Sequence, residues 1–368
     1  MDRAPTFPAN AGPAVGRAAD PRGPERLLWR SYAWCRRVCQ NQYVQKDANQ
    51  PGPDISVLVS SYNHALFVEG AIRSCLLQEG VSLEVIVVDD GSTDDSPARI
   101  QAIEDPRLRV FLQENRGLSR ALNRALSEAR GRWVKFLPSD DRLLPGCLTR
   151  QLAAAAGSLA SFCLPEVVDA DLRSLPDPAP QAWFDMPTAT GSQVAIDLLD
   201  RNCLSAPCGL FSREAALEAG GFDPSMRIAQ DYDLWLRLAS RGDLHRFPER
   251  LVQVRWHGAN QSAAVTSASE GERALALVRA LRRDGLAGWR ERIESVGASA
   301  SEALRLLLLA LVDSGLPQVR PFACELAIEI REAGDELALE PRLNEFFTDS
   351  PELLRPGPWG GLAKGPSS

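Results

Sequence analysis

Three clusters of acidic and hydroxyl-bearing residues each follow a short apolar run in this chain. Residues 60–64 (SSYNH) follow ISVLV, residues 89–94 (DDGSTD) follow LEVIVV, and residues 139–141 (SDD) follow WVKFL with one proline between. An aspartate at a strand end can accept a hydrogen bond from a nucleobase N–H or a ribose hydroxyl. Adjacent carboxylates repel each other, so they suit a site that holds a hard divalent cation and phosphate oxygens. Taken alone, however, DDGSTD is also typical of an ordinary strand-to-helix turn, and SDD of solvated surface.

The apolar runs before these clusters have the length and composition of buried strands. Strands are predicted at residues 55–60, 83–88, 108–112 and 133–137, and helices near residues 65–79, 94–104 and 117–130. This alternation implies right-handed crossovers and a mainly parallel sheet covered on both faces, which is an α/β fold. Ligands of such sheets bind beyond the carboxyl ends of the strands, which is where the three clusters lie.

The segments that flank this region carry no chemical motif. Residues 1–24 contain five prolines and no apolar periodicity, as expected of a disordered tail. Residues 25–44 have one apolar helical face and are predicted to form an amphipathic helix, with a linker up to residue 53. That helix either packs against the main domain or rests its Trp and Arg side chains on a membrane surface, where lipid-linked acceptors are found. Residues 263–350 are predicted to be helical, with helices near 269–283, 299–313 and 316–333, and residues 351–368 a flexible tail.

Composition excludes several classes of protein. The 41 Lys and Arg residues are outnumbered by 48 Asp and Glu residues, and the net charge of −7 argues against a nucleic-acid partner. Cys75, Cys147 and Cys163 fall in predicted buried segments, as in a reduced cytosolic protein. Cys35 and Cys39 lack the further Cys or His pair of a zinc site. Because there is also no signal peptide or membrane-length apolar run, the predicted location is the cytoplasm, with peripheral attachment at the inner face of the membrane through residues 25–44 as the variant.

Six blocks of the sequence, taken in order, resemble one enzyme family. They are VSSYNHALFVEGAIRSCLLQ, VIVVDDGSTDDS, ENRGLSRALNRALSEARGRWVKFLPSDD, GGFD, QDYDLWLRL and VRWHGANQS. Together they resemble the family 2 inverting glycosyltransferases from Ile55 to about Ser262. The resemblance implies a GT-A (Rossmann-like) domain over residues 54–262 that transfers a sugar from a nucleotide-diphosphate sugar to an acceptor hydroxyl, in polysaccharide or glycan assembly.

The resemblance also implies roles for residues of the donor site. Ser60, Tyr62 and Asp90 are expected to line the nucleobase and ribose pocket. Asp140 is expected to contact the ribose or the sugar of the donor. Asp141 is expected to ligate a Mg²⁺ or Mn²⁺ ion that bridges the diphosphate, and His257 matches a histidine that lies near the metal or diphosphate in some relatives. Without the resemblance, His257 would be a half-exposed loop residue.

Asp231 matches the catalytic carboxylate of the family and is the candidate base, because a sugar hydroxyl is a poor nucleophile until its proton is taken. Apart from the resemblance, Asp231 would simply be a favourable acid in the first turn of a helix. The chain departs from the family pattern at Pro138, where an Asp is common, and at Gln230, where a Glu is common. The neutral Gln230 would leave the pKa of Asp231 less raised than a Glu would.

Other functions fit the residues less well. A nucleotidyltransferase or a dinucleotide dehydrogenase needs a Gly-rich loop after the first strand, where this chain has SSYNHA. A non-catalytic nucleotide-sugar-binding or scaffolding protein is the remaining alternative, which Gln230 favours and Asp231 opposes. UDP is the default nucleotide by family frequency, and a glycan, a lipid-linked molecule or a protein could be the acceptor. Trp183 and Trp256 could stack on a sugar or pack in the core. Residues 165–210 are Pro-rich, are expected to be irregular, and do not identify the acceptor.

Overall fold

The computed structural model describes residues 52–175, 184–257, 267–295 and 299–332. The Pro-rich tail predicted at residues 1–24, the amphipathic helix predicted at residues 25–44 and the tail predicted at residues 351–368 lie outside the described residues.

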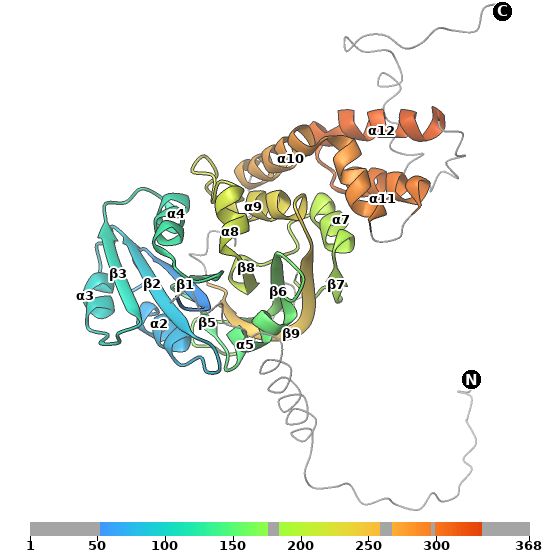
Figure 1. The fold of residues 1–368 in the computed structure, drawn as a ribbon. Coiled ribbons are helices and arrows are strands. Elements are labelled where there is room, and N and C mark those ends of the chain that lie inside the picture. The colour runs from blue at the N-terminus through green and yellow to red at the C-terminus, as the bar shows by residue number, and fades with distance from the viewer. Residues whose placement is uncertain (1–51, 176–183, 258–266, 296–298, 333–368) are drawn as a thin grey trace, which may run out of the picture. The chain divides into compact units, whose positions relative to one another are not determined.

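Within the described residues, nine strands form one sheet (Figure 1). The strands are β1 (Ile55–Ser61), β2 (Leu83–Asp90), β3 (Leu108–Gln113), β4 (Trp133–Pro138), β5 (Arg142–Leu143), β6 (Ala160–Val168), β7 (Ala189–Thr190), β8 (Gly209–Ser212) and β9 (Leu244–Arg255). Their order is β3-β2-β1-β4-β8-β6-β9-β5, and β7 pairs with β9. The long ladders, β1 with β2 and β4, β2 with β3, and β6 with β9, are parallel, while the antiparallel ladders are short.

Helices flank this sheet, and the C-terminal ones pack on other helices. The helices are α2 (Val68–Leu76), α3 (Ser96–Gln101), α4 (Leu118–Glu128), α5 (Cys147–Ala154), α7 (Ser192–Asp200), α8 (Arg213–Glu218), α9 (Gln230–Ala239), α10 (Ser267–Glu294), α11 (Ala300–Asp313) and α12 (Arg320–Glu332), with 3-10 turns η1 (Ala206–Cys208) and η3 (Pro317–Val319). None of the helices in the described ranges combines the length and the hydropathy needed to cross a bilayer.

The parallel strands bury residues on both faces, because successive side chains of a strand point to opposite sides. In β1, Val57 and Val59 belong to a core cluster with Ala71 and Ile72 of α2, whereas Leu58 belongs to a second cluster that includes α4. Figure 1 shows α2 and α3 on one side of β1–β3 and α4 on the other. The predicted α/β fold, a mainly parallel sheet flanked by helices, is therefore confirmed, and the first four predicted strands are β1 to β4.

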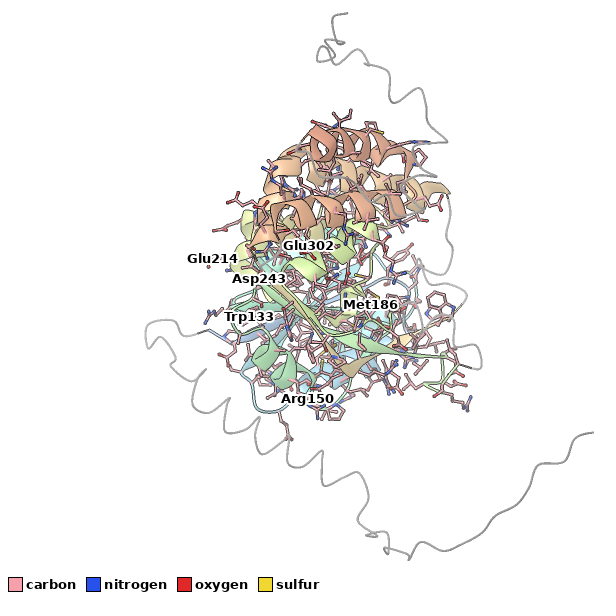
Figure 2. All side chains as sticks on the ribbon, turned by 90° about the vertical axis from the view of Figure 1, so that its right-hand side faces the viewer. Trp133, Arg150, Met186, Glu214, Asp243 and Glu302 are labelled. Atoms are coloured by element: carbon pink, nitrogen blue, oxygen red, sulfur yellow. The ribbon has the colours of Figure 1, made fainter. Side chains whose placement is uncertain are left out.

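The second half of the sheet was not predicted strand by strand. The segment of residues 165–210, which was expected to be irregular, contains β7, α7 and η1. α7 is short, but its Val194 and Leu198 are completely buried, so it belongs to the core rather than to a surface loop. The side chains that fill the space between sheet and helices are drawn in Figure 2, where Trp133 marks the first residue of β4.

The C-terminal helices share the core of the sheet's helices. Leu277 of α10 and Leu307 of α11 are fully buried in the same cluster as Leu198 of α7 and Trp235 of α9. α10 is interrupted at Gly285, whose φ of 66° lies outside the helical region. Helices are thus present where they were predicted within residues 267–295 and 299–332, while residues 333–350 of the predicted helical region lie outside the described residues and a domain boundary near residue 262 stays a prediction. Cys75, Cys147 and Cys163 are buried free thiols, as expected.

Candidate active site

The loops that follow the parallel strands meet at one edge of the sheet. In the ladder register Ser60 of β1 lies beside Val88 of β2 on one side and Pro138 of β4 on the other. The three polar clusters, which follow these positions, are therefore neighbours. The backbone carbonyl of Ser60 also accepts a hydrogen bond from the N–H of Ser139 at 3.2 Å.

The loops after β1 and β2 are tied together by side chains. Asn63 has a left-handed backbone (φ 56°), and its Oδ1 accepts from the Thr93 N–H at 2.8 Å while its own N–H donates to Ser92 Oγ at 2.8 Å. Asp89 in turn accepts from both the N–H and the hydroxyl of Ser92. The DDGSTD segment is thus a rigid turn, and Asp89 has a structural role in it.

Asp90 holds the loop after β3. Its Oδ1 accepts from Gln113 Nε2 at 2.7 Å and from the Arg116 N–H at 2.9 Å, and its Oδ2 accepts from the Gly117 N–H at 2.8 Å. A carboxylate offers about four lone-pair sites, so one remains for a ligand. Gly91 allows this close approach, because a Cβ there would lie 2.6 Å from the backbone nitrogen of Asn115. Asp90 therefore has a structural duty beside its expected contact with a base.

Asp140 and Asp141 lie in a hydrogen-bonded network at the end of β4. Asp141 Oδ1 accepts from the Arg255 N–H at 2.9 Å, and Asp140 Oδ2 lies 3.3 Å from His257 Nε2. The Arg255 guanidinium donates to the backbone carbonyl of Asp140. The rings of His257 and Phe67 stack, with centroids 5.6 Å apart, and the Arg255 guanidinium lies over the same Phe67 ring. The structure thus brings Asp140, Asp141 and His257 together, although they are far apart in sequence.

The negative charge of the two carboxylates in this network is destabilised by burial and by their mutual repulsion. Burial raises the pKa of Asp141 well above its usual range, and the neighbouring Asp140 carboxylate raises it further, while the Arg255 N–H opposes both. No group of three or more His, Cys, Asp and Glu side chains in metal-binding arrangement occurs in the described part of the chain. Mg²⁺ commonly uses one or two carboxylates and takes its other ligands from water and substrate phosphates. One or two of Asp141, Asp140 and His257 would suffice for an ion held in that way, and the contact in the described structure is between His257 and Asp140.

The SSYNH segment supplies further polar groups at this edge. Tyr62 is 48% exposed, so its ring is accessible to a ligand, and Ser60 is partly buried beside it. Ser61 is 1% exposed, and its hydroxyl has no hydrogen-bond partner among the described residues. On the first loop, His64 Nδ1 lies 2.8 Å from the hydroxyl of the buried Ser139. The SSYNH residues thus contribute both framework and free polar groups.

Asp231 lies in the first turn of α9, which lies between β8 and β9 in the sequence. Its Oδ1 accepts from the Tyr232 N–H at 2.7 Å, and Asn202 Nδ2 lies 3.4 Å from its Oδ2. Burial raises the pKa of this carboxyl to about 6, against the weaker effects of those hydrogen bonds. A carboxylate with such a pKa is well matched to accept a proton near neutral pH.

The surroundings of Asp231 contain unused acceptors. The side-chain carbonyl oxygens of Gln230 and Asn202 are buried and have no hydrogen-bond partner within the described ranges. Buried polar atoms without partners are uncommon, and they often mark a place where a ligand or water binds. Hydroxyl or amide donors of a ligand would satisfy them.

The segment before α9 is held by a side chain of α10, the first of the C-terminal helices. Glu272 Oε2 of α10 accepts from the backbone N–H groups of Arg227, Ile228 and Ala229, at 2.9, 2.7 and 3.0 Å. One carboxylate thus satisfies three successive backbone donors just before Gln230 and Asp231. It also complements the positive end of the α9 dipole.

Sequence reasoning found the acids but not the residues that hold them. Arg255, Asn202 and Glu272 were not predicted, because each acts on a site residue that is remote in sequence; Arg255 lies in the block VRWHGANQS, but the block gives no sign of its contact with Asp140 and Asp141. Trp183 lies outside the described residues. Trp256 is partly buried, and its backbone N–H donates to the backbone carbonyl of Val168. The arrangement as a whole is that of an α/β enzyme with its ligand site at the carboxyl ends of parallel strands.

Comparison with known proteins identifies the family. The family model described as "Glycosyl transferase family 2" matches residues 56–218. The succinoglycan biosynthesis protein ExoO of Rhizobium meliloti is 46% identical over 126 residues, which are 33% of this chain and 36% of ExoO. The uncharacterized protein MT1568 of Mycobacterium tuberculosis is 33% identical over 234 residues, which are 59% of this chain and 72% of that protein. A crystal structure of S. aureus TarS in complex with UDP-GlcNAc has the same fold, with a TM-score of 0.50 at 17% identity over 81% of this chain and 91% of that one.

The chain belongs to glycosyl transferase family 2. It is therefore an inverting glycosyltransferase with a nucleotide-sugar donor, built on the GT-A fold. The chain covers about a third of ExoO, so the activity of that whole protein does not transfer directly.

Proposed function

We propose that this enzyme transfers a sugar from a nucleoside-diphosphate sugar, by default a UDP-sugar, to a hydroxyl of a glycan acceptor during polysaccharide assembly. The name of the relative ExoO, a succinoglycan biosynthesis protein, supports the polysaccharide setting. The observation that carries the catalytic proposal is Asp231, a desolvated carboxyl with a pKa of about 6 beside two unpartnered carbonyl oxygens.

The acceptor hydroxyl would bind on the Asp231 side of the site. Asp231 takes its proton as the hydroxyl oxygen attacks the anomeric carbon from the face opposite the diphosphate. The bond from the anomeric carbon to the phosphate oxygen breaks, and its electron pair leaves with the diphosphate, so the anomeric configuration inverts. Gln230 and Asn202 orient the acceptor through their unpartnered oxygens.

The donor would bind over the loops of β1, β2 and β4. Tyr62 and Ser60 line its nucleobase and ribose, Asp90 supplies its remaining lone pair to the base, and Asp140 contacts the ribose or the sugar. Asp141, with His257, would hold a Mg²⁺ or Mn²⁺ ion. Such an ion supplies Lewis-acid stabilisation of the charge on the departing diphosphate.

Thermal stability with nucleotides tests the donor site. Purified protein is heated with UDP, GDP, CDP or TDP, each with and without Mn²⁺, since a ligand of the native state raises the midpoint by mass action. We expect one nucleotide to raise the midpoint only with Mn²⁺, an effect that Asp141→Ala abolishes and the exposed control Glu104→Ala retains. No shift with any nucleotide contradicts the proposal.

A second measurement separates catalysis from binding. The sugar donor of the nucleotide that binds is incubated with the enzyme, and release of the free nucleoside diphosphate is followed with and without candidate glycans. Binding without any release or transfer would support the alternative, a non-catalytic nucleotide-sugar-binding protein.

A further inference from the structure

Two open grooves adjoin along α4 and share Arg116 and Arg120 in their linings. The first has a volume of about 810 Å³ and lies between the start of α4 and the segment that contains Arg227. The second has a volume of about 590 Å³ and continues along α4 past Arg124. Together they form one elongated depression, which we call the basic groove and define by Arg116, Arg120, Arg124 and Arg227.

The four guanidinium groups of the basic groove lack carboxylate partners among the described residues. Arg120 donates to the backbone carbonyl of Arg116, and Arg124 donates to Gln113 Oε1 and to a backbone carbonyl. Arg120 and Arg124 lie one turn apart, about 6 Å along the helix axis, where like charges destabilise a helix. Glu114 is the one acidic residue in the two linings.

This arrangement differs from the rest of the described surface. Many other arginines are paired with acids, such as Arg150 with Glu249 and Arg279 with Asp223, both at 2.8 Å or less. The net charge of the chain is −7, so a concentration of unneutralised cations runs against its composition. Repulsion among them would be relieved by an anionic ligand.

The basic groove reaches the active site at two points. Asp90 binds the backbone N–H groups of Arg116 and Gly117, which places one end beside the expected nucleobase site. Ser119 Oγ donates to the Met226 carbonyl at 2.9 Å and holds the Arg227 segment against α4. Arg227 is four residues before Asp231, so this end leads toward the proposed base.

The donor diphosphate does not account for these charges. The proposed diphosphate site is formed by the loop after β4, where Asp140 and Asp141 lie, and no residue of that loop lines the basic groove. The anionic groups that suit the basic groove are therefore assigned to another molecule.

We propose that the basic groove binds the acceptor, and that this acceptor is an acidic glycan chain with carboxylate or phosphate groups. The inference rests on the proposed function, because it assigns the partner of the same site. A concave, elongated groove suits a chain-like ligand. A protein surface that binds a planar membrane would instead present apolar side chains. Its described lining contains no aromatic ring on which a nucleic-acid base could stack.

Binding of labelled oligosaccharides tests the inference directly. Fluorescence anisotropy compares an oligogalacturonate, which carries one carboxylate per sugar, with a neutral malto-oligosaccharide of the same length. We expect the acidic chain to bind at least about tenfold more tightly, which is about 1.4 kcal/mol. Added salt should weaken its binding, because exposed charges are screened.

Variants locate the binding. The double variant Arg120→Glu/Arg227→Glu should weaken oligogalacturonate binding about tenfold or more. Arg99→Glu, an equal charge change at an exposed arginine of α3, should leave it unchanged. The nucleotide-dependent rise in thermal midpoint, measured in the double variant, checks that it is folded.

Four outcomes would overturn the inference: no binding of oligogalacturonate, equal binding of the neutral chain, wild-type affinity in the double variant, or binding through these arginines only to anionic vesicles or single-stranded DNA. The proposed function fails separately, if wild-type protein shows no nucleotide shift while oligogalacturonate still binds. A normal nucleotide shift together with arginine-independent glycan binding contradicts the inference alone.

Discussion

The donor side and the acceptor side of the site are organised in different ways. On the donor side, the loops after β1, β2 and β3 hold one another, and Asp89 and Asp90 each accept two or three protein hydrogen bonds. On the acceptor side, Gln230 and Asn202 keep unpartnered oxygens within the described structure, and the segment before α9 is held by Glu272 of α10. The carboxylates of the donor side are thus hydrogen-bonded within the protein, whereas two amide oxygens of the acceptor side have no partner among the described residues.

If the two proposed sides are as assigned, this difference would allow the acceptor to change while the donor stays the same. Local contacts between consecutive loops fix the donor side, and these contacts lie within the region that matches the family model. The proposed acceptor side is supported by Asn202, which follows α7, and by Glu272 of α10. Asn202 lies within the matched region, whereas α9 and α10 lie beyond it. Substitutions that separate the two sides test this view.

Removal of the base should have the largest effect. Asp231→Asn keeps the shape of the side chain but cannot take a proton, so transfer should fall by about 10²- to 10⁴-fold. The nucleotide-dependent rise in thermal midpoint should be unchanged, because Asp231 lies on the acceptor side. Glu214→Gln, which changes an exposed first-turn acid of α8 (labelled in Figure 2), is the control. Near-normal transfer by Asp231→Asn would remove this residue from the mechanism.

Loss of the Asp90 carboxylate should destabilise the donor side. In Asp90→Ala two backbone N–H groups and the Gln113 amide lose their acceptor, which costs about 2–3 kcal/mol of unfolding free energy. Denaturant unfolding measures the loss, and nucleotide binding should weaken with it. Asp95→Ala, at an exposed position whose side chain makes no cap, should change neither. If Asp90→Ala were as stable as wild type, the described hydrogen bonds would not be important for the fold.

Loss of Glu272 should affect the acceptor side alone. Glu272→Ala leaves the N–H groups of Arg227, Ile228 and Ala229 without their carboxylate, and we expect a loss of about 1–2 kcal/mol because water can reach this partly buried site. Transfer should fall while nucleotide affinity stays constant. The neighbouring Glu270→Ala, at an exposed position, serves as the control. Equal losses of donor binding and transfer would show that the two sides are not independent.

The pH dependence of Asp231 should appear in both rate and stability. The base works only when deprotonated, so the transfer rate should fall as the pH drops through about 6. The carboxyl has a higher pKa in the folded state than the value of 3.8 for a free side chain, so its stabilising effect is complete below 3.8 and is lost as the pH rises through about 6. Asp231→Asn should therefore be about 1–2 kcal/mol more stable than wild type at pH 7.5 and no more stable near pH 4. An equal difference at both pH values would contradict the raised pKa.

The smallest effect is expected from Gln230→Glu. A second carboxylate beside Asp231 disfavours its charged form, so the acid limb of the pH–rate profile should move upward by less than about one unit. The profile is measured at saturating donor, with Gln193→Glu on the exposed face of α7 as the matched control. An unchanged profile would mean that Gln230 does not face the base, and a downward shift would contradict repulsion between the two carboxylates.

The sequence predicted the donor side far better than the acceptor side. Short apolar runs determine β1 to β4, and the rule that ligands bind at the carboxyl ends of parallel strands brought Asp90, Asp140 and Asp141 to one edge. The family resemblance placed His257 near the metal or diphosphate, but its contact with Asp140 was not predicted. Glu272 and Asn202 had no signal, because a single polar residue in a helix or loop acquires its role from tertiary packing that local patterns do not encode. α7 was missed for a related reason, since its short apolar pattern is surrounded by Pro-rich chain.

The contact of Glu272 with three backbone N–H groups limits how this enzyme can be recombined. A chimera that joins residues up to 262 of this chain to the C-terminal region of another glycosyltransferase would retain Asp231 but lose the carboxylate that fixes the segment before it. The graft would need to bring an acid at the equivalent position of its own first C-terminal helix. An exchange of the C-terminal region therefore has to preserve this contact: a crossover point after α10 keeps Glu272, whereas one before α10 removes it.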